Sequence, residues 1–175
     1  GGRLRYIRTV GRRTAQVLHM TTFHDVPTNL LLPVLAERML DQDSISRPEW
    51  ALHVKTGVHR ERPPTQDNWW EIRSAAVLRK VAIHSPIGVN QLSHMFGGAR
   101  DRGSAPSRAK SGSRHITRTV LQQLEDAGLV ETKKNNAGTI TLGRVLTSAG
   151  HKLINEVAHE VRPTAEEAAP GLTKY

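Results

Sequence analysis

Residues 113–146 read SRHITRTVLQQLEDAGLVETKKNNAGTITLGRVL, and this stretch decides the fold. Its first part predicts a helix over residues 113–127, because one apolar stripe recurs every four residues, at Ile116, Val120 and Leu124. A helix with a single apolar stripe needs a neighbouring element to cover that stripe. We therefore expect this helix to lie against the core of a folded domain.

The second part of the stretch predicts a β-hairpin. Gly128 ends the preceding helix, since glycine adopts the left-handed conformation that commonly closes a helix. Two short runs of alternating residues follow, LVETKK at 129–134 and TITLGR at 139–144. They flank Asn-Asn-Ala-Gly at 135–138, a composition typical of a hairpin turn.

The order of elements around this stretch is that of a winged-helix domain. A short helix is predicted over residues 88–95, and a last helix begins near Thr147 and breaks at Pro163, where proline removes a backbone donor. We therefore expect a mainly helical fold with a small β-hairpin, a winged helix-turn-helix domain with extra N-terminal helices. The expected division of the chain is a basic tail at 1–20, the domain at 21–162 and a frayed tail at 163–175.

Three further helices are expected before the winged helix. They cover residues 30–40, 46–57 and 67–84, and Ser85-Pro86 ends the last of them. At the start of this long helix, Asn68 and Glu71 have the spacing of a reciprocal capping box. Its apolar face is predicted at four positions with helical spacing, Trp69, Ile72, Ala76 and Ile83. The expected structural anchors are Trp50, placed in the core from the short middle helix, and Trp69.

The net charge of +9 is unevenly distributed along the chain. Residues 1–20 carry five arginines and no acid, while residues 21–96 carry eight basic and eight acidic residues. Residues 97–118 carry six basic residues and one acid, and residues 119–175 carry six basic and seven acidic residues. Two acid-poor blocks therefore hold the excess, which favours nucleic acid as the partner. Neither block has an apolar anchoring face, so no membrane partner is expected.

Nine basic side chains form the predicted nucleic-acid-binding surface. The segment 96–110 is rich in glycine and serine, cannot pack into a core and is expected to be a mobile cationic loop. In the helix that follows, Arg114, Arg118 and Gln122 share a face away from the apolar stripe. Arginine suits such a surface, because its guanidinium forks onto phosphates and stacks on unpaired bases. The predicted contacts are Arg73, Arg79 and Lys80 in the long helix, Arg100, Arg102, Arg108 and Lys110 in the loop, and Arg114 and Arg118.

The sequence contains no recognisable catalytic or metal-binding constellation. Its nine histidines lack zinc-binding spacing, HExxH does not occur, and there is no cysteine. The GxSxG, GxGxxG and P-loop signatures are absent as well. We therefore expect no enzymatic activity, no cofactor, no metal and no small-molecule substrate.

Several short motifs occur in an order that is specific in combination. They are PEW at 48–50, VKTG at 54–57, DNWW at 67–70, PIGV at 86–89, FGGARDRGSAPSR at 96–108, TVLQQLEDAGLVE at 119–131 and LTSAGHKL at 146–153. Over about residues 24–160 the chain resembles the S19e family of ribosomal proteins, found in the small subunit of eukaryotic and archaeal ribosomes. The resemblance implies a winged helix bound to ribosomal RNA in the head of that subunit.

The same resemblance implies roles and partners. Trp69 would anchor the long helix, Arg73, Arg79 and Arg118 would fall in the functional basic patch of the family, and the cations of 96–110 would match its basic loop. The partners would be small-subunit RNA, neighbouring proteins of the subunit head and assembly factors on precursor particles, with a part in maturing the small-subunit RNA. The location would be the cytoplasmic ribosome, with passage through the nucleolus and nucleus if the organism is eukaryotic.

Two other classes of protein stay open on the residues alone. A winged-helix transcription regulator would place residues 113–127 in a DNA major groove, and it would need a dimer surface and a basic wing. The wing here offers only Lys133, Lys134 and Arg144. The second class is a protein-interaction module whose basic loop contacts an acidic partner.

Overall fold

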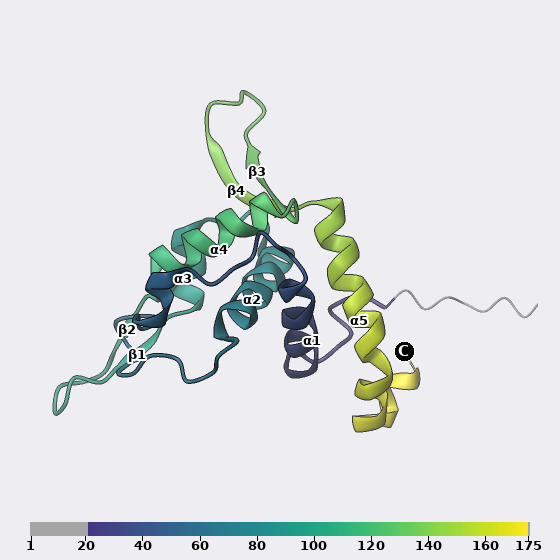
Figure 1. Cartoon of the computed structure of the whole chain (residues 1–175), viewed down its shortest axis with the longest axis horizontal. Helices are drawn as coiled ribbons and strands as arrows, with labels where there is room; N and C mark the ends of the chain where they lie inside the picture. The colour runs from purple at the N-terminus through teal and green to yellow at the C-terminus, as the bar shows by residue number, and fades with distance from the viewer. Residues whose placement is uncertain (1–20, 175) are drawn as a thin grey trace, which may run out of the picture.

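A computed structural model describes residues 21–174, so the basic tail expected at 1–20 lies outside the described residues. None of the helices in this part of the chain is both long and apolar enough to cross a membrane. The elements, labelled in Figure 1, follow in the order α1 (Thr28–Leu40), η1 (Glu49–Leu52), α2 (Trp69–His84), α3 (Val89–Met95), β1 (Gly98–Arg100), β2 (Arg108–Lys110), α4 (Arg114–Asp126), β3 (Val130–Lys134), β4 (Thr141–Leu146), α5 (Ser148–Ala168) and η2 (Pro170–Lys174).

The centre of the fold is a winged helix made of α2, α3, α4 and the β3–β4 hairpin. Helix α4 packs against both α2 and α3, and β3 pairs antiparallel with β4 from Val130 opposite Leu146. The segment before α3 joins this hairpin as a short third strand, because Ile87 and Arg144 exchange two backbone hydrogen bonds of 3.1 and 2.8 Å. The predicted fold class, a mainly helical winged helix with extra N-terminal helices, is therefore confirmed.

The stretch at residues 113–146 folds as its sequence indicates. Ile116, Val120 and Leu124 are at most 2% exposed, so the predicted apolar stripe of α4 faces the core. Gly128, with φ of +72°, ends this helix, and the next amide donates to the Leu124 carbonyl at 3.0 Å. In β4, Gly143 has φ of +146°, and a Cβ there would lie 2.8 Å from the Ile87 nitrogen. Glycine at position 143 therefore allows the β3–β4 hairpin to approach the backbone of Ile87, which precedes α3.

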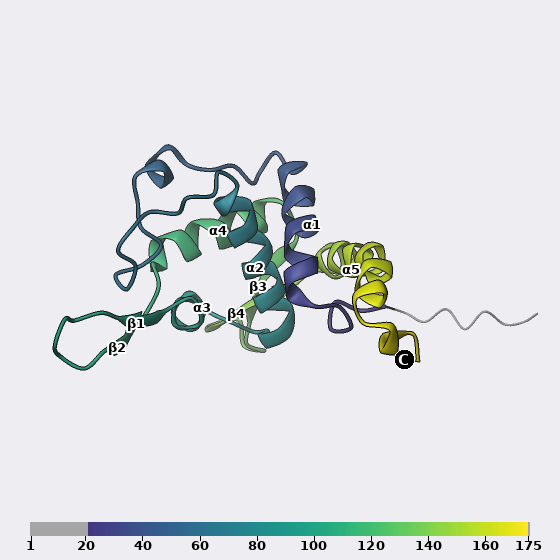
Figure 2. The ribbon, with the colours of Figure 1, turned by 90° about the horizontal axis from the view of Figure 1, so that it is seen from below.

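Helices α1 and α5 pack together on one side of the winged helix (Figures 1 and 2). Arg38 of α1 and Glu160 of α5 form an ion pair of 3.0 Å. The segment before α1 also contacts α5, since Arg162 donates to the Thr21 hydroxyl at 2.8 Å. These contacts attach the start of the described chain to its last long helix.

The predicted core face of α2 is right at Trp69, which is buried, but Ile72 and Ala76 are only half-buried. Ile83 is 36% exposed, while the fully buried side of the helix carries Trp70, Val77, Leu78 and Val81. This helix is apolar around most of its circumference, so helical spacing alone does not single out one stripe. The capping box expected at its start is also not formed, because no side chain hydrogen-bonds to the amides there.

Trp70 is the aromatic centre of the core, and the sequence interpretation missed it. Its indole N–H donates to Gln123 Oε1 of α4 at 2.9 Å, and the Gln123 amide donates to the Ser46 carbonyl at 2.7 Å. Trp69, which is buried, and Trp50, which is half-buried, each contact the Trp70 ring edge-on, with centroid distances of 5.3 and 5.7 Å. The connected pair of hydrogen bonds joins α2, α4 and the segment before η1.

Two connecting segments differ from the sequence prediction. Only Glu49–Leu52 of the expected helix at 46–57 is helical, as one 3₁₀ turn. Beyond that turn the chain extends so that the Thr56 carbonyl accepts the Ser113 amide at 2.9 Å. The expected loop at 96–110 contains a β-hairpin, with Gly98 opposite Lys110 and Arg100 opposite Arg108.

The break predicted at Pro163 is also wrong, because α5 continues through it to Ala168. Pro163 lies on the exposed side, where solvent can satisfy the carbonyl that loses its donor. The buried stripe of α5 continues from Val161 to Ala165 across this residue. An ion pair of 2.6 Å between Arg162 and Glu166 also spans it. Apolar burial thus continues on both sides of the proline.

Candidate nucleic-acid interface

The β1–β2 hairpin projects from the helices and carries four exposed cations. Figures 1 and 2 show it at one end of the molecule, with α5 near the opposite end. Arg100 and Arg108 lie directly opposite each other on the two strands. Like charges in that position repel, so the pair gains from a bound anion. The exposed cations of this hairpin are Arg100, Arg102, Arg108 and Lys110.

Within residues 21–174, none of the four hairpin cations forms an ion pair with a carboxylate. In residues 21–174 the ion pairs involve other cations, namely Arg38, Arg144, Lys152 and Arg162. The acid within the hairpin, Asp101, instead accepts the Gly103 amide at 2.9 Å. The positive charge of the hairpin is therefore available to a partner.

A groove at the base of the hairpin brings together cations from three segments. Arg100 of β1, Arg114 of α4 and Lys55 of the connector after η1 all line it. The backbone fixes this arrangement, since the isolated bridge between Gly57 and Gly112 ties the connector to the residue before the α4 cap. Ser113 caps α4, its hydroxyl accepting the Ile116 amide at 3.4 Å. The groove thus adjoins the positive end of the α4 dipole.

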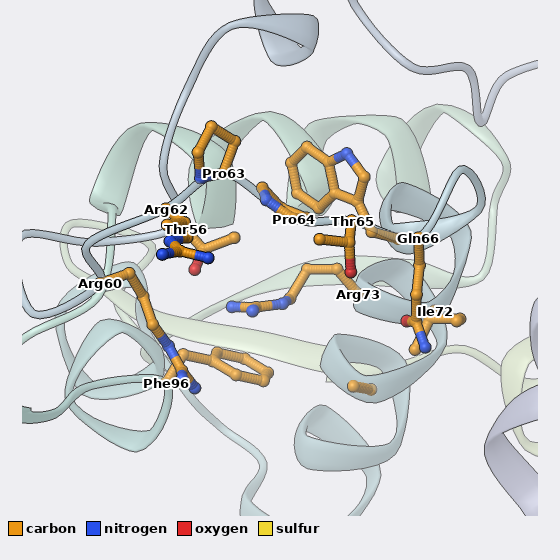
Figure 3. Close-up of a pocket in the computed structure, with 12 residues that line it drawn as sticks. Thr56, Arg60, Arg62, Pro63, Pro64, Thr65, Gln66, Ile72, Arg73 and Phe96 are labelled. Atoms are coloured by element: carbon orange, nitrogen blue, oxygen red, sulfur yellow. The ribbon is translucent and has the colours of Figure 1, made fainter.

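A second concavity lies on the other side of the same connector, and we call it the Arg73 pocket. Figure 3 shows the Arg73 side chain crossing this pocket above the Phe96 ring, with its guanidinium pointing toward Arg60 and Arg62. The guanidinium carbon lies 4.4 Å from the Phe96 ring centroid, a cation–π contact. Burial and the neighbouring Arg60 charge lower the pKa of Arg73 from its ordinary value. The pocket therefore concentrates positive charge in a partly desolvated place.

His59 packs against Gly57 and Gly98, and its pKa is lowered. A Cβ at Gly98 would lie 3.1 Å from the ring, and within residues 21–174 the buried Nδ1 has no hydrogen-bond partner. Burial, followed by the charges of Arg60 and Arg73, lowers the pKa of His59. The positive charges that contribute to the lowered pKa of His59 would also attract an anionic ligand.

The remaining predicted contacts lie further along the helices. Arg118 is exposed one turn after Arg114, on the exposed face of α4 that also carries Gln122. Arg79 and Lys80 are half-buried and lie about 10 Å beyond Arg73 along α2, from the rise per residue. Arg79 Nε is buried and has no hydrogen-bond partner among the residues that the structure describes.

The sequence interpretation assigned Lys55, Arg60 and Arg62 to no site. Lys55 lies in the segment expected to be helical at 46–57, Arg60 and Arg62 lie in the stretch that follows it, and nothing in their spacing points to Arg73 or Arg114. In the part of the chain that the structure describes, no group of three histidine, aspartate or glutamate side chains could hold a metal ion.

Comparison with known proteins identifies the family. The model of the ribosomal protein S19e family matches residues 22–164, most of the chain. The chain belongs to the ribosomal protein S19e family. Small ribosomal subunit protein eS19 of Haloarcula marismortui is 41% identical over 160 residues, 89% of this chain and 99% of that protein. The eS19 proteins of Aeropyrum pernix and Thermoplasma volcanium are each 35% identical, covering 86% and 89% of this chain and 96% and 99% of their own lengths.

Membership of the S19e family settles the class of the protein. S19e proteins are structural ribosomal proteins and not enzymes. The match begins at residue 22, next to the first described residue, and ends at residue 164, within α5. The β1–β2 hairpin and the Arg73 pocket therefore both lie in the S19e part of the chain.

Proposed function

We propose that this chain is a structural constituent of the small ribosomal subunit and binds small-subunit RNA in the head. Its binding surface comprises the hairpin cations, the groove with Arg114, the exposed Arg118 and, on α2, Arg73, Arg79 and Lys80. The observation that carries the proposal is the projecting β1–β2 hairpin, whose four cations have no carboxylate partner in the described chain. Arginines of this kind bind phosphates and recognise RNA by shape and backbone.

The same proposal includes a contribution to assembly. Neighbouring proteins of the subunit head and assembly factors on precursor particles would contact surfaces that the RNA leaves free, and the protein would take part in RNA maturation. The place of action is the cytoplasmic ribosome, reached through the nucleus and nucleolus if the organism is eukaryotic. Family membership supports this proposal over a transcription regulator, although α4 has the exposed arginines that such a regulator would also use.

Sedimentation of cell lysates on sucrose gradients tests the proposal. The wild-type protein should travel with small subunits and their precursors, while Arg118→Glu and Arg102→Glu shift toward the top. Lys152→Glu is the matched control, because Lys152 is exposed on α5 and forms an ion pair with Glu156 of the same helix. A wild-type protein that stays at the top at low salt, or that prefers duplex DNA to small-subunit RNA, would overturn the proposal. Particle association that survives nuclease treatment would favour a protein-interaction module.

A further inference from the structure

We propose that the Arg73 pocket binds one unpaired nucleotide that turns out of an RNA helix, with the phosphate on its arginines and the base against its apolar wall. This inference rests on the proposed RNA-binding function and adds to it a defined nucleotide site. It concerns residues between 56 and 66, after η1, to which the sequence interpretation assigned no role.

The charge of the pocket calls for an anion. Arg60, Arg62 and Arg73 all line it, and no aspartate or glutamate does. Within the described chain, none of these three guanidinium groups forms an ion pair or donates a side-chain hydrogen bond to protein. Holding three like charges around one partly desolvated space is unfavourable until an anion enters, and a phosphate accepts several guanidinium hydrogen bonds at once.

The other wall of the pocket suits a planar apolar group. Phe96, Trp69, Pro64, Ile72 and Ala76 contribute apolar surface to it. The Arg73 guanidinium already stacks on one side against Phe96. Unpaired bases stack on aromatic rings and on guanidinium planes, so this wall matches a base better than a second phosphate. The pocket volume of about 440 Å³ falls in the range of roughly 300–1,000 Å³ typical of small-molecule sites.

The depth of Arg73 distinguishes this site from ordinary backbone contacts. Arg60 and Arg62 are exposed at the mouth of the pocket, whereas Arg73 is half-buried. A phosphate in a continuous duplex cannot enter the pocket far enough to reach Arg73. A nucleotide in a bulge or loop can, because its bases splay out of the stack. An acidic peptide could satisfy the charges, but it would leave the aromatic and guanidinium faces without a stacking partner.

The test compares two short RNA hairpins, one with a single bulged uridine and one fully paired, by fluorescence anisotropy with the full chain. The wild type should bind the bulged hairpin about tenfold more tightly, the scale of one base–aromatic stack. The double variant Arg60→Gln and Arg62→Gln should lose this preference. The matched control, Arg100→Gln with Arg108→Gln, removes the same charge from exposed strand residues and should weaken binding of both hairpins by a similar factor.

The outcomes separate the two proposals. If the wild type binds neither RNA at low salt, the proposed function itself fails. If it binds both hairpins equally, or if the two double variants behave alike, RNA binding stands and the nucleotide site is overturned. Displacement of the bulged hairpin by polyglutamate as effectively as by the same unlabelled RNA would overturn it in favour of an acidic peptide.

A crosslinking experiment gives a second readout that does not depend on affinity. A hairpin with 4-thiouridine at the bulge should crosslink, on irradiation, to peptides that contain Trp69 or Phe96. Crosslinks confined to residues 98–110 would place the base on the hairpin and would exclude the pocket. Phe96→Leu keeps an apolar side chain but removes the ring, so it should reduce this crosslink by a larger factor than it weakens binding of the paired hairpin.

Discussion

Replacing the four hairpin cations with glutamine should reduce the salt dependence of RNA binding by an amount that the structure allows one to calculate. Arg100, Arg102, Arg108 and Lys110 are exposed and have no carboxylate partner in the described chain, so each can neutralise one phosphate. Each lost phosphate contact lowers the slope of log K against log salt by about 0.7 to 0.9, so four contacts lower it by about 3 to 3.5. Between about 50 and about 200 mM salt, the ratio of the wild-type binding constant to that of the variant should therefore fall by roughly 60- to 130-fold.

The assay is a titration of a labelled fragment of small-subunit RNA, the head domain, at several potassium chloride concentrations. Its control is the double variant Arg38→Gln and Lys152→Gln, which removes cations from α1 and α5 that already form ion pairs with Glu160 and Glu156. The slope of this control should equal that of the wild type. A quadruple variant with an unchanged slope would show that the hairpin contacts no phosphate, and the reasoning from unpaired exposed charge would be refuted.

Three further predictions concern the fold. Trp70→Phe should lower the free energy of unfolding by about 2 to 3 kcal/mol in urea titrations, because it leaves the half-buried Gln123 side-chain oxygen without its donor and removes packed volume; a loss under about 0.5 kcal/mol would contradict the role of this hydrogen bond. Pro163→Ala should raise stability by about 1 to 3 kcal/mol, since proline disfavours a helix interior; no gain would indicate a helix that ends before this residue. The pKa of His59 is lowered in the folded protein. Below the ordinary histidine pKa, the unfolded chain therefore binds a proton that the folded chain does not bind. The free energy of unfolding should for this reason decrease as the pH decreases from 7 to 5. His59→Gln should make that decrease smaller, and an equal decrease in the variant would contradict the lowered pKa.

The winged helix could be predicted because its signals are local. The stripe at Ile116, Val120 and Leu124 needs only a helical period, and the turn at 135–138 needs only its Asn and Gly residues. Gly128 marks the end of α4 for the same reason. In each case the residues that decide the conformation are neighbours in the sequence.

The errors occurred where distant segments decide the structure. The chain after η1 is extended because it pairs with residues before α4, and neither segment shows this alone. The core face of α2 depends on which neighbours cover a helix that is apolar nearly all round. The hairpin at 98–110 escaped prediction because its short strands have no alternating apolar pattern.

The candidate interface was predictable in its charge but not in its shape. An acid-poor, arginine-rich segment pointed to the hairpin, and the exposed stripe with Arg114 and Arg118 could be read from helical spacing. The Arg73 pocket could not be read in this way. Arg62 and Phe96 lie on either side of Arg73 in the sequence, and only the tertiary fold brings them together around it.

The contacts between α1 and α5 have a consequence for how the protein is made. A ribosome synthesises the chain from its N-terminus, so α1 emerges before the winged helix, while α5, which covers one side of α1, emerges after it. The winged helix of α2, α3, α4 and the β3–β4 hairpin is complete before that helix exists. We therefore expect the nascent winged helix to form around a partly uncovered α1. The ion pair of Arg38 with Glu160 and the bond from Arg162 to Thr21 then close the two ends of the domain in its final folding step.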